Sequence, residues 1–341
     1  MSSALALQDM ADTATLVEDA GFGGLWLTEA GRTAYLSCGA AALATERITL
    51  GTAVAVAFPR SPMVTAQVAW ELADATGGRF VLGLGTQVKA HIERRYSSEY
   101  TPPGPRMKEY VQAIKAIFRA FRGEEKLSFA GDFYEFSLLP GQWSPGAIGA
   151  PDPPVYISAV LPYMSRLAGE ACDGVHIHPF HSRDYLHDVQ IPHIAAGAAR
   201  AGRDLADVTL ECPIMTAVGD NEAEIAASRE SARMMVAFYG STRTYSPVFE
   251  IHGFEGLSDK LHQAQRQGDM AAMARLITDE VLSHYIVEAT WDDLPRALLD
   301  RYRGLAPSVR VMSYTAMGQM KNDRAVVERW SDVASAMRSA D

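Results

Sequence analysis

The chain has 341 residues, of which 48% are hydrophobic and 21% are charged, and its formal net charge is −10. The length is too great for one small core, and the composition is that of an ordinary globular protein. The acidic balance, without a long basic run, argues against nucleic acid as a partner, because phosphate backbones are bound by clustered Lys and Arg.

Cysteine usage and the first residues bear on the compartment. Cys38, Cys172 and Cys212 are far apart and form no CxxC pair, which disfavours both a disulfide framework and a zinc cluster. The first 14 residues lack the basic segment and long apolar run of a signal peptide. No apolar run reaches the roughly 18 residues of a membrane span. We therefore expect a cytoplasmic protein that does not contact the membrane.

Short apolar runs alternate with helical patterns along most of the chain. Apolar runs of this length are typical of parallel strands in βα units, which are covered on both faces. They predict strands near residues 25, 50, 82, 156, 177, 212 and 312. The helical patterns lie at residues 9–20, 36–46, 61–77, 106–123, 164–172, 184–202, 221–238, 257–283 and 292–305.

These strands are one short of a closed eight-stranded barrel. Either SSALAL at residues 2–7 supplies the eighth, or the chain starts a few residues late. Eight such units close as a barrel with the active site at the carboxyl ends of the strands, and an open doubly wound sheet is the alternative. From residue 97 to 150 a loop, a predicted hairpin at 129–136 and a Pro/Gly-rich passage interrupt the alternation.

The stretch GGRFVLGLGTQVKAHIERRY, residues 77–96, combines a buried strand with glycines and a basic helix. A dinucleotide fingerprint is excluded, because Val88 stands where its third glycine would be. Gly83 and Gly85 either keep the backbone slim so that a flat ring can lie against it, or form a plain tight turn. The basic residues that follow face either an anion or solvent.

Two other strand ends carry weaker signals. Small residues in AVAVAFPRSP, residues 53–62, leave room for a planar cofactor, although ordinary core packing is the favoured explanation from the sequence alone. In YISAVLPYMSRLAG, residues 156–169, a helix begins at Pro162, and its free N–H groups suit a phosphate. The alternative is a helix N-terminus without a ligand.

Histidines and one glutamate are the candidate chemical groups. In HIHPFH, residues 176–181, His176 and His178 share one face of a strand, as two metal ligands would. The later strand ends TAVG and SYTAM add no further ligand, so we expect no metal and interpret the histidines as pocket-lining or packed. Glu29 ends a strand and is a candidate acid, base or ring partner, or else a solvated loop carboxylate.

Taken together, these segments resemble the bacterial luciferase-like superfamily, and within it the oxidoreductases that use the deazaflavin coenzyme F420. The likeness extends from about residue 10 to 316, and the GGRFVLGLGT block is its most specific part. The similarity lies in residues 20–29, 46–72, 77–96, 106–118 and 153–175. The segment AFYGSTRTY, residues 237–245, resembles one subgroup.

The resemblance implies an α/β fold, a (β/α)8 TIM barrel of luciferase-like type with insertions. We expect one domain over residues 1–341, with insertion segments near 97–150 and 237–285. The cofactor ring would lie at the carboxyl-end mouth of the barrel. A non-prolyl cis peptide bond would join Ala53 and Val54, with Val54 as a bulge under the ring.

The residues and the resemblance together suggest candidate roles. His176, His178 and Glu29 are the catalytic candidates, with Tyr35 and Arg32 as further possible proton donors. The substrate pocket would include Arg32, Tyr35, Phe58 and His181. The cofactor-binding residues would be Glu29, Ala53, Val54, Val56, Gly85, Thr86, Gln87, His91, Ser158, Ala159, Val160, Tyr163 and Met164.

The expected function is hydride transfer between F420 and a small or medium organic substrate, such as a ketone, enone or alcohol. Sugar-phosphate oxidation is not expected, because Glu29 and Ala30 replace that subgroup's Asp-His pair and Val88 replaces its glutamate. The alternatives are an FMN-dependent two-component monooxygenase, a metal-dependent barrel hydrolase and a non-catalytic relative. A homodimer is expected from the resemblance alone.

Overall fold

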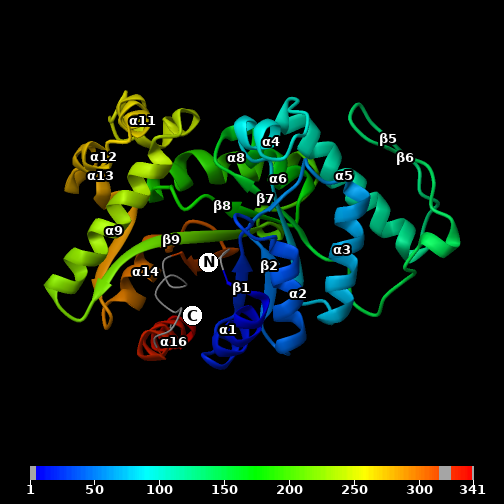
Figure 1. Ribbon diagram of the computed structural model, residues 1–341, viewed down its shortest axis with the longest axis horizontal. Helices are drawn as coiled ribbons and strands as arrows, with labels where there is room; N and C mark the ends of the chain where they lie inside the picture. The colour runs from blue at the N-terminus through cyan, green and yellow to red at the C-terminus, as the bar shows by residue number, and fades with distance from the viewer. Residues whose placement is uncertain (1–4, 315–323, 340–341) are drawn as a thin grey trace.

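The computed structural model describes residues 5–314 and 324–339 (Figure 1). Its main sheet has nine strands, and every pairing in it is parallel. The strands are β1 (Gly24–Leu27), β2 (Thr49–Thr52), β3 (Ala55–Val56), β4 (Phe80–Gly85), β7 (Val155–Ala159), β8 (Gly174–Ile177), β9 (Thr209–Gly219), β10 (Ile286–Thr290) and β11 (Val309–Ser313).

All strand positions predicted near residues 25 to 312 are confirmed, and so is the hairpin, as β5 (Phe129–Ala130) and β6 (Glu135–Phe136). The sequence analysis missed β10. The sheet runs β1-β2-β4-β7-β8-β9, after which β9 pairs with two strands. Its first half pairs with β11 and its second half with β10. The 11 residues of β9 are therefore long enough to pair with both strands, one after the other.

Helices follow the strands, as the alternation predicts. Ser61 caps α3 by accepting a hydrogen bond from the Met63 amide, and Pro62 occupies its first turn. The α-helices are α1 (Leu7–Asp19), α2 (Ala34–Ala44), α3 (Pro62–Ala75), α4 (Lys89–Arg94), α5 (Pro103–Arg122), α6 (Pro162–Ala171), α7 (Arg183–Tyr185), α8 (Ile191–Arg200), α9 (Glu222–Gly240), α10 (Pro247–Glu250), α11 (Leu257–Gln267), α12 (Met270–Leu276), α13 (Asp279–Ser283), α14 (Leu294–Tyr302) and α16 (Arg324–Ser339). A π-helical turn, Leu186–Gln190, joins α7 to α8.

The expected strand at residues 2–7 is wrong where the structure describes it. Leu5 and Ala6 lie outside any strand and Leu7 begins α1, while residues 2–4 lie outside the described part of the chain. Within the described ranges, no pairing joins β1 to β11. Since Gln8 to Asp19 follow a helical pattern, the segment has no length left for a strand after Leu5.

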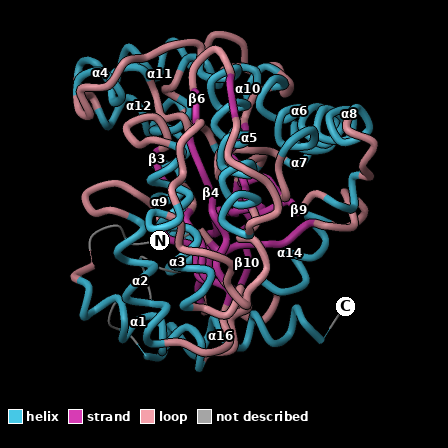
Figure 2. Tube along the Cα trace, turned by 90° about the vertical axis from the view of Figure 1, so that its right-hand side faces the viewer, coloured by secondary structure: helices cyan, strands magenta, loops and turns pink. Residues whose placement is uncertain are grey.

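Two large hydrophobic cores pack the described part of the molecule, and a third, small cluster of Trp26, Val81 and Tyr156 lies beside His176. The larger one fills the space between the sheet and the surrounding helices, with Leu82, Ile157 and Tyr110 fully buried. The second lies under α9 and α11 to α13 and includes Phe249 and Tyr285. Figures 1 and 2 both place α4 and α11 at one end of the molecule and α1 and α16 at the other. None of the described helices is long and apolar enough to cross a membrane.

Candidate functional site

Val54, Gly85 and Ser158 form a narrow row at the carboxyl ends of neighbouring strands. Val54 lies between β2 and β3, Gly85 ends β4, and Ser158 is in β7. Val54 and Ser158 lie on either side of Gly85: a Cβ built on Gly85 would be 2.4 Å from Val54 Cγ2 and 3.3 Å from Ser158 Oγ. The peptide bond between Ala53 and Val54 is cis, as the resemblance implies. Gly85 is therefore glycine because the Val54 bulge occupies the space that a side chain would need.

Glu29 is held by the segment that follows this bulge. Its carboxylate oxygens accept hydrogen bonds from the Val56 amide at 2.8 Å and from both terminal nitrogens of Arg60, at 2.5 and 2.9 Å. The Glu29 side chain is only 5% exposed. Such a bidentate, buried pair fixes geometry and leaves no free oxygen for proton transfer. This geometry favours a positioning role for Glu29, and its role as a catalytic acid or base stays a prediction.

His176 lies inside the barrel, below this row. A Cβ on Gly83 would be 2.5 Å from its Nε2 and 1.9 Å from the Thr52 carbonyl oxygen, so Gly83 makes room for this ring. Trp26 and Tyr156 pack against the ring, with centroids at 4.9 and 5.6 Å. Burial lowers the pKa of His176 to about 3. A neutral, enclosed imidazole is a packed residue, and it does not support the catalytic role predicted for His176.

His178, two residues further along, is the better placed histidine. Its Nδ1 accepts a hydrogen bond from the Phe180 amide at 3.1 Å. Burial lowers the pKa of the ring to about 4, so the ring is neutral at pH 7 and its proton sits on Nε2. Tyr239 and Tyr245 flank it, with ring centroids at 4.7 and 5.0 Å. His178 therefore presents an N–H donor between two aromatic walls.

The remaining cofactor candidates lie around the same end of the sheet. Thr86 and Gln87 are half-buried after β4, and Gln87 has a φ of 56°, a left-handed conformation that concentrates at functional turns. The carbonyls of Ala159 and Val160 accept hydrogen bonds from Gln190 and Tyr185.

The helix that follows β7 has an uncapped start. Tyr163 and Met164 lie in the first turn of α6, where no side chain caps the helix. Tyr163 is 46% exposed and packs over Gly104 at the start of α5. Free N–H groups at such a turn can bind an anion by donating hydrogen bonds to it. His91, by contrast, is exposed on α4 and has no described contact with the row.

The residues predicted to line the substrate pocket lie in different environments. Phe58 and Tyr35 are buried, each beneath a guanidinium group, and Arg32 is exposed. His181 does not belong to an open pocket: its Nδ1 contacts the His178 carbonyl at 2.8 Å and its Nε2 the Tyr302 hydroxyl at 3.1 Å. Both nitrogens are used inside the fold, because the chain turns inward after Phe180.

Sequence reasoning missed several residues at this end. Arg60 was not predicted to belong to the site. A usable signal was present, because the acidic Glu29 follows one strand and the basic Arg60 follows a later strand. The AFYGSTRTY segment supplies Tyr239 and Tyr245, and the Tyr239 hydroxyl hydrogen-bonds to that of Tyr314. The segment and Tyr314 lie more than 50 residues after His178 in the sequence, so local patterns did not connect these tyrosines to His178.

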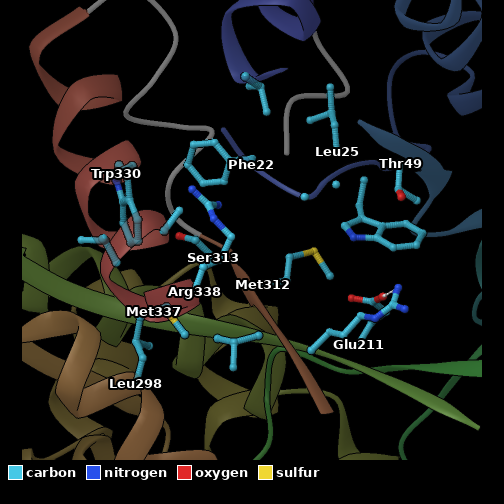
Figure 3. A pocket seen from close by; sticks show the side chains of 18 residues that line it. Phe22, Leu25, Thr49, Glu211, Leu298, Met312, Ser313, Trp330, Met337 and Arg338 are labelled. Atoms are coloured by element: carbon cyan, nitrogen blue, oxygen red, sulfur yellow. Dashed lines mark ion pairs between the residues drawn. The ribbon is translucent and has the colours of Figure 1, made fainter. Parts of the chain in front are cut away.

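A cavity of about 500 Å³ lies elsewhere, between β1 and β11 and under α1 and α16 (Figure 3). Glu211 and Met312 point into it, and Trp330 and Met337 line it from α16. Burial raises the pKa of Glu211 to about 7, and its nearest cation is Arg310 at 3.6 Å. The chemistry expected at the strand carboxyl ends does not involve this cavity, which opens where the sheet has two unpaired edges.

Known proteins resemble the chain over nearly its whole length. It is 40% identical over 299 residues to an uncharacterized protein of Mycobacterium tuberculosis, covering 88% of each chain. It is 32% identical over 290 residues to 5,10-methylenetetrahydromethanopterin reductase of Archaeoglobus fulgidus, covering 82% of this chain and 81% of that one.

Two solved structures share the fold. The coenzyme F420 dependent tetrahydromethanopterin reductase of Methanopyrus kandleri superposes with a TM-score of 0.77 at 19% identity, covering 96% of this chain and 95% of that one. A type II Baeyer-Villiger monooxygenase of Pseudomonas putida, in complex with FMN, gives 0.64 at 15% identity, covering 99% and 96%.

The fold class predicted from the sequence is confirmed by the parallel sheet and by these structures. A family model described as luciferase-like monooxygenase matches residues 1–308. The chain therefore belongs to the luciferase-like monooxygenase family.

Proposed function

We propose that this protein is an oxidoreductase that uses coenzyme F420 to transfer a hydride to or from a small or medium organic carbonyl compound or alcohol. The observation that carries the proposal is the row of Val54, Gly85 and Ser158, whose strand β7 pairs with β8, the strand that His178 follows. The backbone at Gly85 has no side chain, so a flat cofactor ring could lie over it. The N–H of His178 could then donate a hydrogen bond to a carbonyl substrate above the ring. The similarity to the coenzyme F420 dependent tetrahydromethanopterin reductase of Methanopyrus kandleri supports the choice of cofactor.

The residues present fit such a group in two respects. The absence of a side chain at Gly85 leaves the Val54 bulge and Ser158 as the floor of the mouth. The uncapped first turn of α6 offers N–H groups for a phosphate in the cofactor's tail. When bound, the deazaflavin would supply the hydride chemistry, and the protein would supply binding and orientation.

The protein's own contribution would come chiefly from His178. Its neutral ring donates an N–H from Nε2, which suits the oxygen of a carbonyl substrate and stabilises the negative charge that develops on it. A neutral histidine acts as an electrophile in this way in well-studied enzymes. Tyr239 and Tyr245 would exclude water from this oxygen. The Glu29–Arg60 pair would keep the Val54 segment in place.

Turnover with reduced cofactors tests the proposal. The protein is mixed without oxygen with reduced F420 and a panel of ketones and enones, and the return of oxidised F420 is followed by absorbance. The expected result is oxidation of the cofactor that depends on both protein and substrate.

The second candidate is an FMN-dependent monooxygenase, which the family match and the FMN-containing structure favour. Turnover that requires reduced FMN and oxygen, with no reaction of F420, would replace the first candidate with the second.

A further inference from the structure

Three metal-ligating side chains from separate segments meet beside the loop that follows β8. Asp184 lies in α7, His252 follows α10, and His284 follows α13. One ligand atom from each lies within 4.8 Å of the other two. The residues are too far apart in the sequence for a spacing motif to reveal them.

A hydrogen bond prepares His252 for binding a metal. Its Nε2 lies 2.7 Å from Oγ of Ser182, a residue that is only 1% exposed. When Ser182 accepts this proton, Nδ1 keeps its lone pair, and Nδ1 faces Asp184 Oδ2 at 3.8 Å. Metal-binding histidines almost always donate their other N–H to such an acceptor, which fixes the ring.

The surroundings keep the second nitrogen donor close. The rings of His252 and His284 lie with centroids 3.9 Å apart, and Phe254 packs beside both rings. The His252 side chain is 6% exposed, whereas that of Asp184 is 58% exposed and free to move. Ligand atoms around tetrahedral zinc are roughly 3.3 Å apart, so the three groups would have to move closer together, and the exposed Asp184 side chain has room to do so.

The charges around the cluster both favour and oppose a cation. Asp184 supplies one negative charge. Arg301 opposes the cation, but its guanidinium is engaged with the carbonyl oxygens of His284 and Ile286 at 2.8 and 3.3 Å.

We propose that Asp184, His252 and His284 form a binding site for one divalent transition-metal ion of the zinc class. Two imidazole nitrogens and one carboxylate suit zinc, whereas calcium and magnesium prefer oxygen ligands. The ion would join α10 and α13 of the insertion to the loop that carries His178 and Ser182. The site is independent of the cofactor and therefore of the proposed function.

Zinc binding by the full-length, chelator-treated protein is the test. Competition with a chromophoric indicator should show one site per chain with micromolar or tighter affinity. The melting temperature should rise by on the order of 4 °C at a hundredfold excess of zinc over the dissociation constant. Cobalt in place of zinc should give a visible spectrum with nitrogen and oxygen ligands.

The variants Asp184→Asn and His284→Gln should weaken zinc binding at least tenfold. Asp184 is exposed, so its substitution should leave the circular dichroism spectrum unchanged. The matched control is His187→Gln with Asp188→Asn, an exposed pair whose Nδ1 and Oδ1 lie 2.5 Å apart on the neighbouring turn. Wild-type binding weaker than millimolar, or equal binding by the wild type and both site variants, would overturn the proposal.

Discussion

Two buried glutamates, at opposite ends of the barrel, are held in opposite ways. Glu29 at the carboxyl-end mouth has an arginine and a backbone amide on its carboxylate. Glu211 faces the cavity between β1 and β11, where its Oε1 has no hydrogen-bond partner among the described residues and only a long ion pair, 3.6 Å, to the exposed Arg310. A buried charge is tolerated when it is paired and is costly when it is not. The carboxylate at the mouth is therefore held in one position by its partners, whereas the carboxylate at the cavity lacks such hydrogen bonds.

Removing the partner of Glu29 gives the largest expected effect. Arg60→Met leaves a carboxylate that is 5% exposed without its counter-ion, so the free energy of unfolding should fall by about 3–5 kcal/mol. Urea denaturation measures this. Arg296→Met is the control, because its ion pair with Asp293 is on the surface and is worth less than about 1 kcal/mol.

A double variant, Glu29→Gln with Arg60→Met, should recover part of that stability. It removes the unpaired charge together with its partner. Equal losses in the single and double variants would contradict the paired-charge explanation.

The second prediction concerns the pH dependence that Glu211 imposes. Its pKa is raised to about 7 in the folded protein, so the folded state binds more protons than the unfolded one between about pH 4.5 and 7. The contribution of Glu211 to stability is therefore highest below pH 4.5, and up to ~3 kcal/mol is lost as pH rises through 7.

Glu211→Gln removes this proton uptake. The stability difference between variant and wild type should therefore grow in favour of the variant from pH 5 to 8, as measured by urea denaturation at each pH. Taking the difference cancels the titration of the buried histidines. Parallel curves would show that Glu211 is already ionised in the folded state.

The third prediction tests whether Gly85 is required by its neighbours. Gly85→Ala places a Cβ 2.4 Å from Val54 Cγ2, and such overpacking costs about 1–3 kcal/mol. Gly39→Ala is the matched control: it lies in α2, and a Cβ there meets nothing within 4 Å. That control should be neutral or stabilising by up to about 1 kcal/mol. Thermal melting of both variants compares them, and equal stabilities would contradict the packing of the row.

The smallest expected effect is on turnover. His178→Phe removes the Nε2 donor and should lower kcat by roughly ten- to a hundredfold, while His178→Gln should retain part of the rate. Because the pKa of His178 is about 4, the wild type should show no inflection from this residue near pH 6.5. His187→Phe, an exposed substitution, is the control. An inflection near 6.5 that disappears in His178→Gln would contradict the neutral-donor role.

Most of the fold followed from the sequence because buried parallel strands are continuous apolar runs. β10 escaped because its Ile286–Thr290 segment contains Glu288 and has only two fully buried residues. The strand expected at residues 2–7 was an inference from counting, and the helical pattern from Leu7 onward opposed it.

The site was less predictable. Alternation places His176 and His178 on one face and cannot say that one lies inside the barrel and the other at its mouth. The glycine pattern indicated that another group lies close to the backbone at Gly85. The nearest such group is a side chain of the protein itself, that of Val54. The pairing of Glu29 with Arg60 depends on how the chain turns after Val54, which no local pattern encodes.

The central claim, that this mouth receives F420, is tested most directly by binding. The purified protein is titrated with F420 and, separately, with FMN, and fluorescence quenching is followed for the wild type and for Gly39→Ala. We predict micromolar or tighter binding of F420 and much weaker binding of FMN by both proteins. Tight binding of FMN alone, or of neither cofactor, would contradict it.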